Sequence, residues 1–334
     1  MAELEGYGVN ERNTEVLEQY ELEVRSLRRG RGAWICETDR GLKLLKEYKG
    51  TQKRLEFEEA VLDALKRRGS FQVDQYVRSR EGALVTVAGD GTRCILKDWF
   101  ADRECSVQSE EETVRAVTQI AVLHRQLRDI PLREEWNLGS ILAESALSEM
   151  RRHNRELCRA RNYIRRKQRK SEFELCVTGN FAPFFEQAKQ AEEGLAALIE
   201  AGGRPRQYLC HGELNQHHIL MGQGYLAVIE FNRMHLGVQA ADLYHFIRKV
   251  LEKHDWDCRL GRRLLESYER VLPMEETERK YLYYRFLYPE KYWKQLNFYF
   301  NAGKAWIPAR NVEKLKNLEA QQEERDRFLE EIRR

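Results

Sequence analysis

The chain has 334 residues, of which 42% are hydrophobic and 33% are charged, and its formal net charge is +3. This length suffices for one large domain or two lobes with a buried core. The small net charge gives no argument for nucleic acid binding, and no apolar run approaches the roughly 20 residues that cross a membrane. The acidic N-terminus, Met1 to Tyr7, has no hydrophobic stretch, so no secretory signal is expected.

The cysteines are an odd number and include no Cys-x-x-Cys pair. They are Cys36, Cys94, Cys105, Cys158, Cys176, Cys210 and Cys258. This spacing argues against a zinc site and against a disulfide framework. We therefore expect synthesis in a reducing cytoplasm.

The first hundred residues predict a small lobe of strands around one helix. Trp34–Thr38 and Leu42–Lys46 flank a good hairpin turn at residues 39–41. A helix is expected from Arg54 to Leu65, because apolar residues recur there at helical spacing, with its end near Gly69. Two more short strands are expected at Leu84–Val87 and Cys94–Leu96.

From about residue 108 onward the sequence predicts helices. They are expected at Glu111–Leu127, at about 140–170 and at 181–201, with one strand-containing hairpin at 208–232. The architecture that fits is a strand-rich lobe over residues 1–100, a hinge near 97–105 and a helical lobe over 106–334. Periodicity alone supports an α+β chain that is mostly helical.

The segment 210–233 has the layout of a phosphotransferase catalytic loop followed by a metal-binding segment. In kinase-type sites the loop reads His-x-Asp, an Asn follows five residues after the Asp, and a metal-binding Asp lies on the next hairpin. Here His211 is present, but Glu213 stands at the base position. His218 stands at the Asn position and Glu230 at the metal position.

A kinase-type cleft also needs a strand lysine for the phosphates and a helix glutamate to hold that lysine. Lys46 ends an apolar strand just before a helix that carries Glu56 and Glu59. Gly30 and Gly32 precede the first hairpin strand and could approach phosphates closely. The alternative for Lys46 is an ordinary surface lysine at the end of a strand. The alternative for Gly30 and Gly32 is a plain turn.

Asp242 lies where small-molecule kinases place a helix aspartate that hydrogen-bonds the backbone of the catalytic loop. An ordinary carboxylate near the positive end of a helix is the alternative, and the two roles are compatible. His211-Gly212 before an acid, followed by Ile219-Leu220, is the pattern of the kinases related to aminoglycoside and choline kinases.

Seven further segments follow one another along the chain: Asp98-Trp99, Arg103-Glu104-Cys105, Cys210–His217, Ala241–Tyr244, Arg248–His254, Tyr288–Lys294 and Lys304–Ile307. Taken in this order, they resemble the CotS family of bacterial spore coat proteins. The resemblance implies a bilobal, kinase-like fold similar to aminoglycoside phosphotransferases and expression during sporulation. It also implies synthesis in the mother-cell cytoplasm, deposition in the spore coat with other coat proteins, and in many members a degenerate site.

The departures at three positions favour a disabled site, as in a pseudokinase. The extra methylene of Glu213 moves the carboxylate by roughly 1.5 Å, and a misplacement of about 1 Å can cost on the order of a hundredfold in rate. Glu230 has the same lengthening. At His218 an imidazole replaces an amide oxygen, although magnesium prefers oxygen ligands. Asn232 removes a second possible carboxylate, and Asn215 comes three residues too early to substitute simply.

Two functions are therefore weighed. The first is a coat scaffold or binding protein that requires no cofactor. The second is an active small-molecule phosphotransferase that uses ATP and Mg²⁺, with Glu213 as base and Glu230 as metal ligand. Nucleotide is a possible ligand in either case, and no membrane partner is expected.

The basic segment 151–170 raises a third possibility, a nucleic acid or another polyanion. Only Tyr163 is aromatic there, so no stacking platform is visible. A solvated basic helix is favoured, and such a helix could dock an acidic coat partner. The aromatic residues of 281–300 recur at helical spacing and are expected to be packing core rather than a sugar platform. The last segment, 311–334, is expected to form an exposed helix or an interaction arm.

Overall fold

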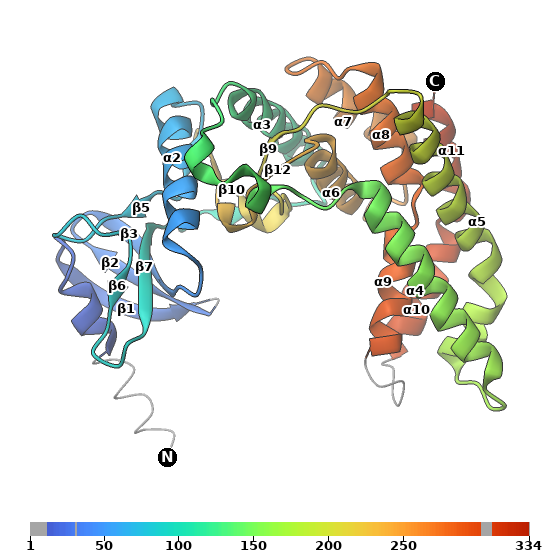
Figure 1. The fold of residues 1–334 in the computed structure, drawn as a ribbon, viewed down its shortest axis with the longest axis horizontal. Coiled ribbons are helices and arrows are strands. Elements are labelled where there is room, and N and C mark those ends of the chain that lie inside the picture. Colours follow the sequence, from blue (N-terminus) through green and yellow to red (C-terminus); the bar gives the residue numbers. More distant parts are fainter. Residues whose placement is uncertain (1–11, 31, 302–308, 334) are drawn as a thin grey trace. The chain divides into compact units, whose positions relative to one another are not determined.

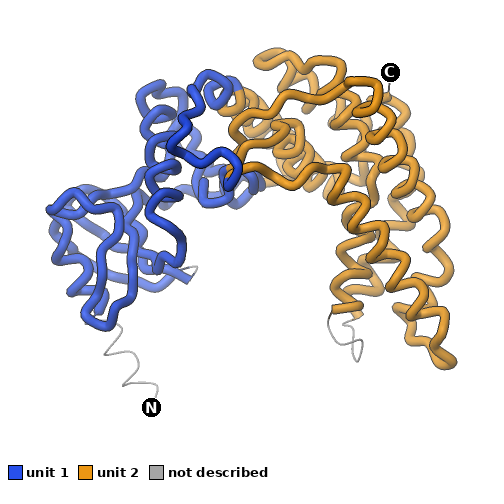
Figure 2. The backbone as a smooth tube through the Cα atoms, in the orientation of Figure 1, with its two compact units in different colours: residues 1–105, 125–140, 211–234 blue, residues 106–124, 141–210, 235–334 orange. Residues whose placement is uncertain are grey.

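The computed structural model describes residues 12–30, 32–301 and 309–333. Outside these residues lie Met1 to Tyr7, Arg31 and the segment Lys304–Ile307, which was one of the segments that resemble the CotS family. The chain forms two compact units (Figure 2). Unit 1 contains residues 1–105, 125–140 and 211–234, and unit 2 contains residues 106–124, 141–210 and 235–334.

Unit 1 contains a six-stranded antiparallel sheet with the helix α2 (Figure 1). The strands are β1 (Val24–Gly30), β2 (Ala33–Thr38), β3 (Gly41–Glu47), β7 (Arg93–Asp98) and β5 (Tyr76–Val77), in that spatial order, with β6 (Thr86–Val87) paired to β7. The β2–β3 hairpin and the later strands confirm the sequence prediction. One face of the sheet is covered by the helical residues 12–17, because Val16, Leu17 and Tyr20 pack against Leu45 and Cys36.

Helix α2 (Gln52–Arg68) confirms the predicted helix, including its end. The Thr51 side chain accepts a hydrogen bond from the Arg54 N–H at the start of the helix. Gly69 ends it with φ +67°, the left-handed conformation that glycine adopts without steric cost.

A second, four-stranded sheet in unit 1 joins distant parts of the chain. Its order is β4 (Gln72–Val73), β11 (Leu226–Val228), β10 (Ile219–Met221) and β8 (Arg103–Glu104), and β4 runs parallel to β11. The expected boundary put the loop at 210–233 in the helical lobe. The structure instead groups residues 211–234 with the N-terminal strands, because β10 and β11 hydrogen-bond to β8 and β4.

Unit 2 is helical apart from the two-stranded pair β9 (Tyr208–Cys210) and β12 (His235–Gly237). Helix α3 (Glu110–Arg128) begins in this unit, and eight further helices of the described residues follow. They are α4 (Ala146–Arg166), α5 (Glu172–Glu200), α6 (Ala240–Leu251), α7 (Cys258–Glu269), α8 (Glu276–Leu287), α9 (Glu290–Asn301), α10 (Ala309–Ala320) and α11 (Gln322–Arg333).

Helix α5 begins earlier than the predicted residue 181. Ser171 and Glu174 form a capping box, in which each side chain accepts a hydrogen bond from the other residue's backbone N–H. Phe173 and Val177 are buried one turn apart, so the first two turns already pack against the unit. Pro183 lies inside the helix.

Several aromatic residues of α8 and α9 form packing core, as predicted, whereas Phe298 is 48% exposed. Tyr292 is 1% exposed, and its ring stacks on Phe184 with centroids 4.3 Å apart. The rings of Phe286 and of Phe328 on α11 meet edge to face, with their centroids 5.3 Å apart. The prediction of an exposed C-terminal helix or arm is wrong for residues 309–333, because Leu315 and Phe328 are fully buried.

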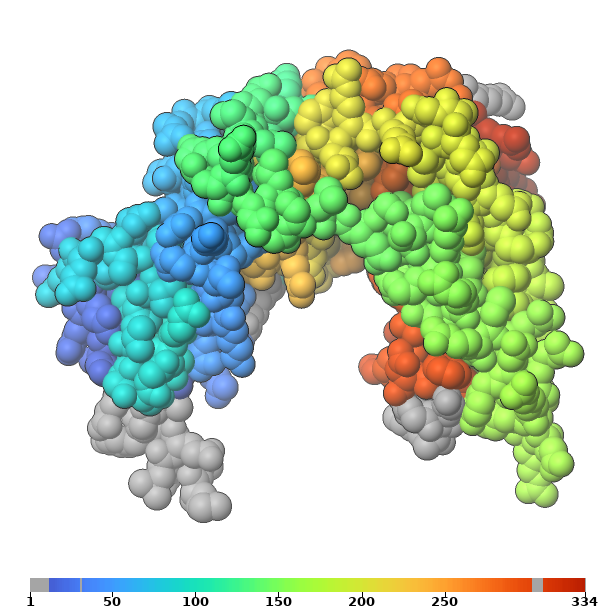
Figure 3. All heavy atoms as spheres, viewed as in Figure 1, coloured from blue at the N-terminus to red at the C-terminus, as the bar shows by residue number. Residues whose placement is uncertain are grey.

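Helix α4 carries most of the predicted basic segment and lies on the face drawn in Figure 3, in green. Its exposed arginines are Arg151, Arg155, Arg159, Arg161, Arg165 and Arg166. Part of this charge is compensated within unit 2, since Arg151 pairs with Glu192 and Arg152 with Glu144. Among the described residues, no helix is long and apolar enough to cross a membrane.

Candidate nucleotide site

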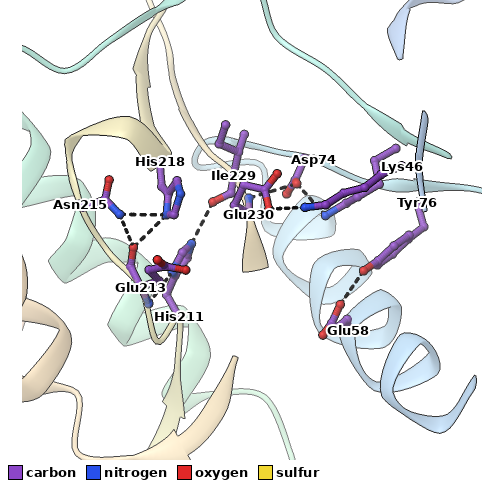
Figure 4. Close-up of polar contacts among 11 residues, drawn as sticks. Lys46, Glu58, Asp74, Tyr76, His211, Glu213, Asn215, His218, Ile229 and Glu230 are labelled. Atoms are coloured by element: carbon purple, nitrogen blue, oxygen red, sulfur yellow. Dashed lines mark hydrogen bonds and ion pairs between the residues drawn. The ribbon is translucent and has the colours of Figure 1, made fainter. Parts of the chain in front are cut away.

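The predicted loop, metal segment and strand lysine meet within unit 1 (Figure 4). Strand β3 carries Lys46, the loop 211–218 precedes β10, and Glu230 follows β11. The second sheet positions the last two elements, since β10 and β11 form an antiparallel hairpin.

His211 fixes the shape of the loop. Its Nε2 donates to the carbonyl oxygen of Ile229 at 2.9 Å, and its Nδ1 accepts the Glu213 N–H at 3.2 Å. The ring is fully buried. Because both ring nitrogens bind backbone groups, His211 holds the loop against the end of β11 and has a positioning role.

Asn215 caps the short 3-10 helix η3 (Gln216–His218). Its Oδ1 accepts the His217 N–H at 2.9 Å, and its Nδ2 donates to the Glu213 carbonyl at 2.9 Å. The amide oxygen is therefore already engaged by the backbone. This cap fixes the direction of the oxygen and uses one of its two lone pairs.

His217 and His218 lie in this 3-10 helix. His218 Nδ1 lies 2.8 Å from the Glu213 carbonyl oxygen. Because a carbonyl oxygen only accepts, Nδ1 must carry the proton, and the lone pair of the neutral ring lies on Nε2. A ring nitrogen is a poor replacement for the oxygen ligands that magnesium prefers. His217 instead pairs with Glu104 on β8.

Glu213 is held by its backbone and exposed at its side chain. Its N–H bonds His211, and its carbonyl accepts from Asn215 and His218. Thus three side chains shape the backbone at the base position while the carboxylate reaches solvent. Figure 4 shows this group of contacts around the loop.

Glu230 forms the charged centre of the site. Its carboxylate lies 3.4 Å from Lys46 Nζ. Its backbone is left-handed at φ +66° and ψ +51°, which is strained for a residue with a side chain. The Glu230 N–H donates to Asp74 Oδ2 at 3.1 Å, so Asp74 supports this conformation.

Asp74 was missed by the sequence analysis. It follows β4, and the parallel pairing of β4 with β11 brings it beside Glu230. Asp74 Oδ2 also accepts from Lys97 Nζ at 2.6 Å, and both side chains are buried. Burial raises the pKa of the Asp74 carboxyl, and the Lys97 ammonium opposes that shift. No local sequence signal marks Asp74, because its partner lies 156 residues away.

The buried glutamate of α2 is Glu58, which the sequence analysis did not select. Glu58 accepts hydrogen bonds from Arg54 Nε and from the Tyr76 hydroxyl, each at 2.5 Å. The two predicted glutamates lie elsewhere: Glu56 is exposed and bonds Gln52, and Glu59 pairs with Arg78. Burial at 2% exposure distinguishes Glu58, and it is flanked by the apolar face of Leu55 and Leu62.

Arg54 ties helix α2 to the metal segment. Its Nη2 donates to the carbonyl oxygens of Asn232 at 3.1 Å and Met234 at 2.6 Å. The same guanidinium binds Glu58 through Nε. Helix α2 is therefore linked to the 3-10 helix η4 (Phe231–Arg233) that follows Glu230.

The two predicted glycines lie at the β1–β2 turn. Gly30 pairs with Ala33 across the strands, and a Cβ at Gly30 would lie 2.9 Å from the Ile35 side chain. Gly32 has φ +74°, so this turn requires a residue that adopts the left-handed region freely.

Asp242 lies in the first turn of α6 in unit 2 and is 2% exposed. Its Oδ2 lies 3.5 Å from Nε2 of the fully buried His124. His124 in turn contacts the Tyr268 hydroxyl through Nδ1 at 2.8 Å. The role in shaping the catalytic loop remains a prediction.

Residues 23–282 match the family described as the phosphotransferase enzyme family, APH. The chain belongs to this family. No match was found among curated proteins. Family membership confirms the expected relation to aminoglycoside phosphotransferases.

Several solved structures of phosphotransferases and small-molecule kinases have folds similar to that of this chain. An aminoglycoside phosphotransferase from Alicyclobacillus acidocaldarius aligns with a TM-score of 0.82 at 17% identity, over 96% of this chain and 95% of that chain. Spectinomycin phosphotransferase bound to AMP aligns at 0.66 and 13%, over 93% and 94%. A microcompartment-associated aminopropanol kinase aligns at 0.60 and 15%, over 96% and 97%. These similarities confirm the kinase-like fold, with a sheet-rich N-terminal region and a helical C-terminal region.

Against the phosphotransferase template, the site keeps one carboxylate where a metal would be expected. Magnesium is commonly held by one or two carboxylates together with substrate phosphates. Glu230 can supply one such ligand, and Lys46 can supply charge for phosphates. Within the described ranges, no group of three or more His, Cys, Asp and Glu side chains is arranged to hold a metal ion.

Proposed function

We propose that this member of the phosphotransferase family is a binding scaffold that acts in spore coat assembly. It keeps the phosphate end of a nucleotide site but transfers phosphate poorly and requires no cofactor for its role. The CotS-like segments support synthesis in the mother cell and deposition in the coat with other coat proteins. The inferred binding role rests on the site, and the cellular role rests on the resemblance.

The observation that carries the proposal is that the His218 and Asn215 side chains are both hydrogen-bonded to the backbone of the loop. His218 stands at the metal-binding Asn position, and its Nδ1 proton bonds the Glu213 carbonyl at 2.8 Å. The Asn215 amide oxygen, which could have replaced it, caps η3 at 2.9 Å. His218 offers a ring nitrogen where magnesium prefers an oxygen, and the η3 cap fixes the direction of the Asn215 oxygen, so the second oxygen ligand expected for metal is missing. Phosphoryl transfer depends on metal charge and positioning, so its loss is costly.

The test restores the template residues in one variant, Glu213→Asp with His218→Asn and Glu230→Asp. We expect the native chain to show no magnesium-dependent ATP hydrolysis or transfer above background. The triple variant should gain at least about tenfold, because Glu213→Asp and Glu230→Asp return the shorter carboxylates and His218→Asn returns an amide oxygen. Adding Lys46→Met to the triple variant is the matched control and should remove the gain.

Native turnover of about 1 s⁻¹ or more, the ordinary range for kinases, would contradict the scaffold proposal. Acceptors in that assay should include amino alcohols and aminoglycosides, since proteins with similar folds are described as kinases of these compounds.

The second candidate function is an ATP- and Mg²⁺-dependent small-molecule phosphotransferase. It is favoured by the Lys46–Glu230 pair at 3.4 Å and by the left-handed backbone of Glu230. Strained backbone of this kind collects at functional sites. On this reading MgATP raises the melting temperature, and Glu230→Gln removes the magnesium-dependent part. Lack of any shift at millimolar MgATP would exclude the enzyme.

A further inference from the structure

Trp99 lies between two apolar layers of unit 1. The first layer consists of Ala33 and Ile35 on β2 and Leu44 on β3. The second consists of Leu220 on β10 and of Ala227 and Ile229 on and after β11. Trp99 packs against both layers and is itself partly exposed.

Both layers begin beside the charged pair of the candidate site. Leu44 precedes Lys46 by two residues on β3, so the two side chains share one face of the sheet. Ile229 directly precedes Glu230. A nucleotide whose phosphates lie at Lys46 and Glu230 would therefore place its flat, largely apolar base between these layers. That is the space in which Trp99 makes its contacts.

Hydrogen bonds hold the backbone at Trp99 in place, so the motion that remains is rotation of the indole. The Trp99 N–H donates to the Leu42 carbonyl at 3.0 Å, and the Asp98 N–H donates to the Gln75 carbonyl at 2.8 Å. Lys43 Nζ also lies 2.8 Å from the Asp98 carboxylate. Rotation of a partly exposed side chain is a fast motion that these backbone contacts permit.

We propose that the Trp99 indole occupies the base end of the nucleotide site, so that a base binds only after the indole has turned out. This rests on the nucleotide site of the proposed function. The indole and a purine bind the same apolar surfaces, so they compete for them. The apparent affinity is reduced by the fraction of molecules in which the slot is open.

The test compares MgATP and MgGTP binding to the native full chain and to Trp99→Ala by isothermal titration calorimetry. We expect Trp99→Ala to bind at least about tenfold more tightly, because removal of the indole leaves the slot open. Trp99→Phe should show a smaller gain and replaces Trp99→Ala if that variant does not fold. Trp34→Ala is the matched control, since Trp34 packs against the Val16 and Tyr20 cluster instead. Its affinity should equal that of the native chain.

Equal affinities for the native chain and the Trp99 variants would overturn the proposal, since the indole would then not compete with the base. Weaker binding by Trp99→Ala would also overturn it and would make Trp99 a stacking surface for the base. Both results leave the nucleotide site of the proposed function intact. If neither the native chain nor any variant binds nucleotide at millimolar concentration, both the proposed nucleotide site and the proposed position of the Trp99 indole within it would be wrong.

Discussion

His211, Asn215 and His218 each bond the backbone of the loop, whereas Glu213 at the base position reaches solvent. The side chains that shape the loop are thus engaged, and those expected to hold metal are replaced. Sequence comparison with a kinase template identified all four positions. It could not show that the Asn215 oxygen is already bound, because that depends on the 3-10 turn.

Asp74 and Lys97 give a prediction at the residue scale. Their side chains are 4% and 8% exposed and lie 2.6 Å apart. Asp74→Asn keeps the shape but leaves the Lys97 charge buried without a carboxylate. We expect a loss of about 3–5 kcal/mol in the free energy of unfolding of unit 1, measured by denaturant titration.

The control for this experiment is the double variant Asp74→Asn with Lys97→Met, which removes both charges, keeps a side-chain oxygen for the Glu230 N–H and should recover most of the loss. If Asp74→Asn alone costs less than about 1 kcal/mol, the pair would behave as a solvent-exposed ion pair and the buried assignment would be wrong.

His245 on α6 predicts a pH dependence. Burial lowers its pKa to about 4, the nearby Arg285 and Arg248 act in the same direction, and Glu290 and Asp242 oppose them. The unfolded chain binds this proton below about pH 6.5, whereas the folded chain does not until near pH 4. Stability is therefore lost as the pH falls through this window, by about 1–2 kcal/mol for a residue that is only partly buried.

The measurement is the melting temperature at about pH 7.5, 6 and 4.5 for the native chain and for His245→Gln. Other groups titrate in both proteins, so only the difference between them reports His245. We expect the variant to lose less stability on acidification. Parallel curves would show that His245 titrates normally in the fold.

At the scale of elements, local sequence signals were sufficient to predict a helix or hairpin whose cap or turn residues lie within the element itself. The Gly69 cap, the 39–41 turn and the helical spacing of 54–65 all lie within a few residues of the element that they define. Pairing of β4 with β11 had no such signal, because two residues of each strand meet across about 150 residues of chain. That pairing is what brings Asp74 to Glu230.

Packing of α7 against α11 predicts the effect of Gly261→Ala. A Cβ at Gly261 would lie 2.5 Å from the ring of Phe328, which is fully buried and cannot move aside. We expect a loss of about 1–3 kcal/mol despite the better helix propensity of alanine, measured by thermal unfolding. Gly179→Ala on α5 is the control, because nothing lies within 4 Å of that Cβ. It should be neutral or stabilising by up to about 1 kcal/mol.

An unchanged melting temperature for Gly261→Ala would mean that α11 does not pack as described. The C-terminal helices would then be available as the interaction arm that the charge pattern had suggested.

For the whole molecule, the proposed scaffold role predicts that binding surfaces matter and the base position does not. Deletion of the gene in its native spore-former should disturb coat assembly, and Glu213→Ala should restore it fully at normal protein level. Coat composition and spore resistance are the measurements. If Glu213→Ala fails as completely as the deletion, while the protein is present, the chain acts through chemistry at this site.

The sequence by itself indicated the kinase-like fold and the relation to aminoglycoside phosphotransferases, and it selected the residues proposed for the catalytic and metal positions. These depend on short motifs and on periodicity, which local chemistry encodes. Only the tertiary structure decided which side chains are engaged, because those contacts join segments far apart in the chain. Lys46 with Glu230, Asp74 with Lys97, and Trp99 between its two apolar layers are all contacts of this kind.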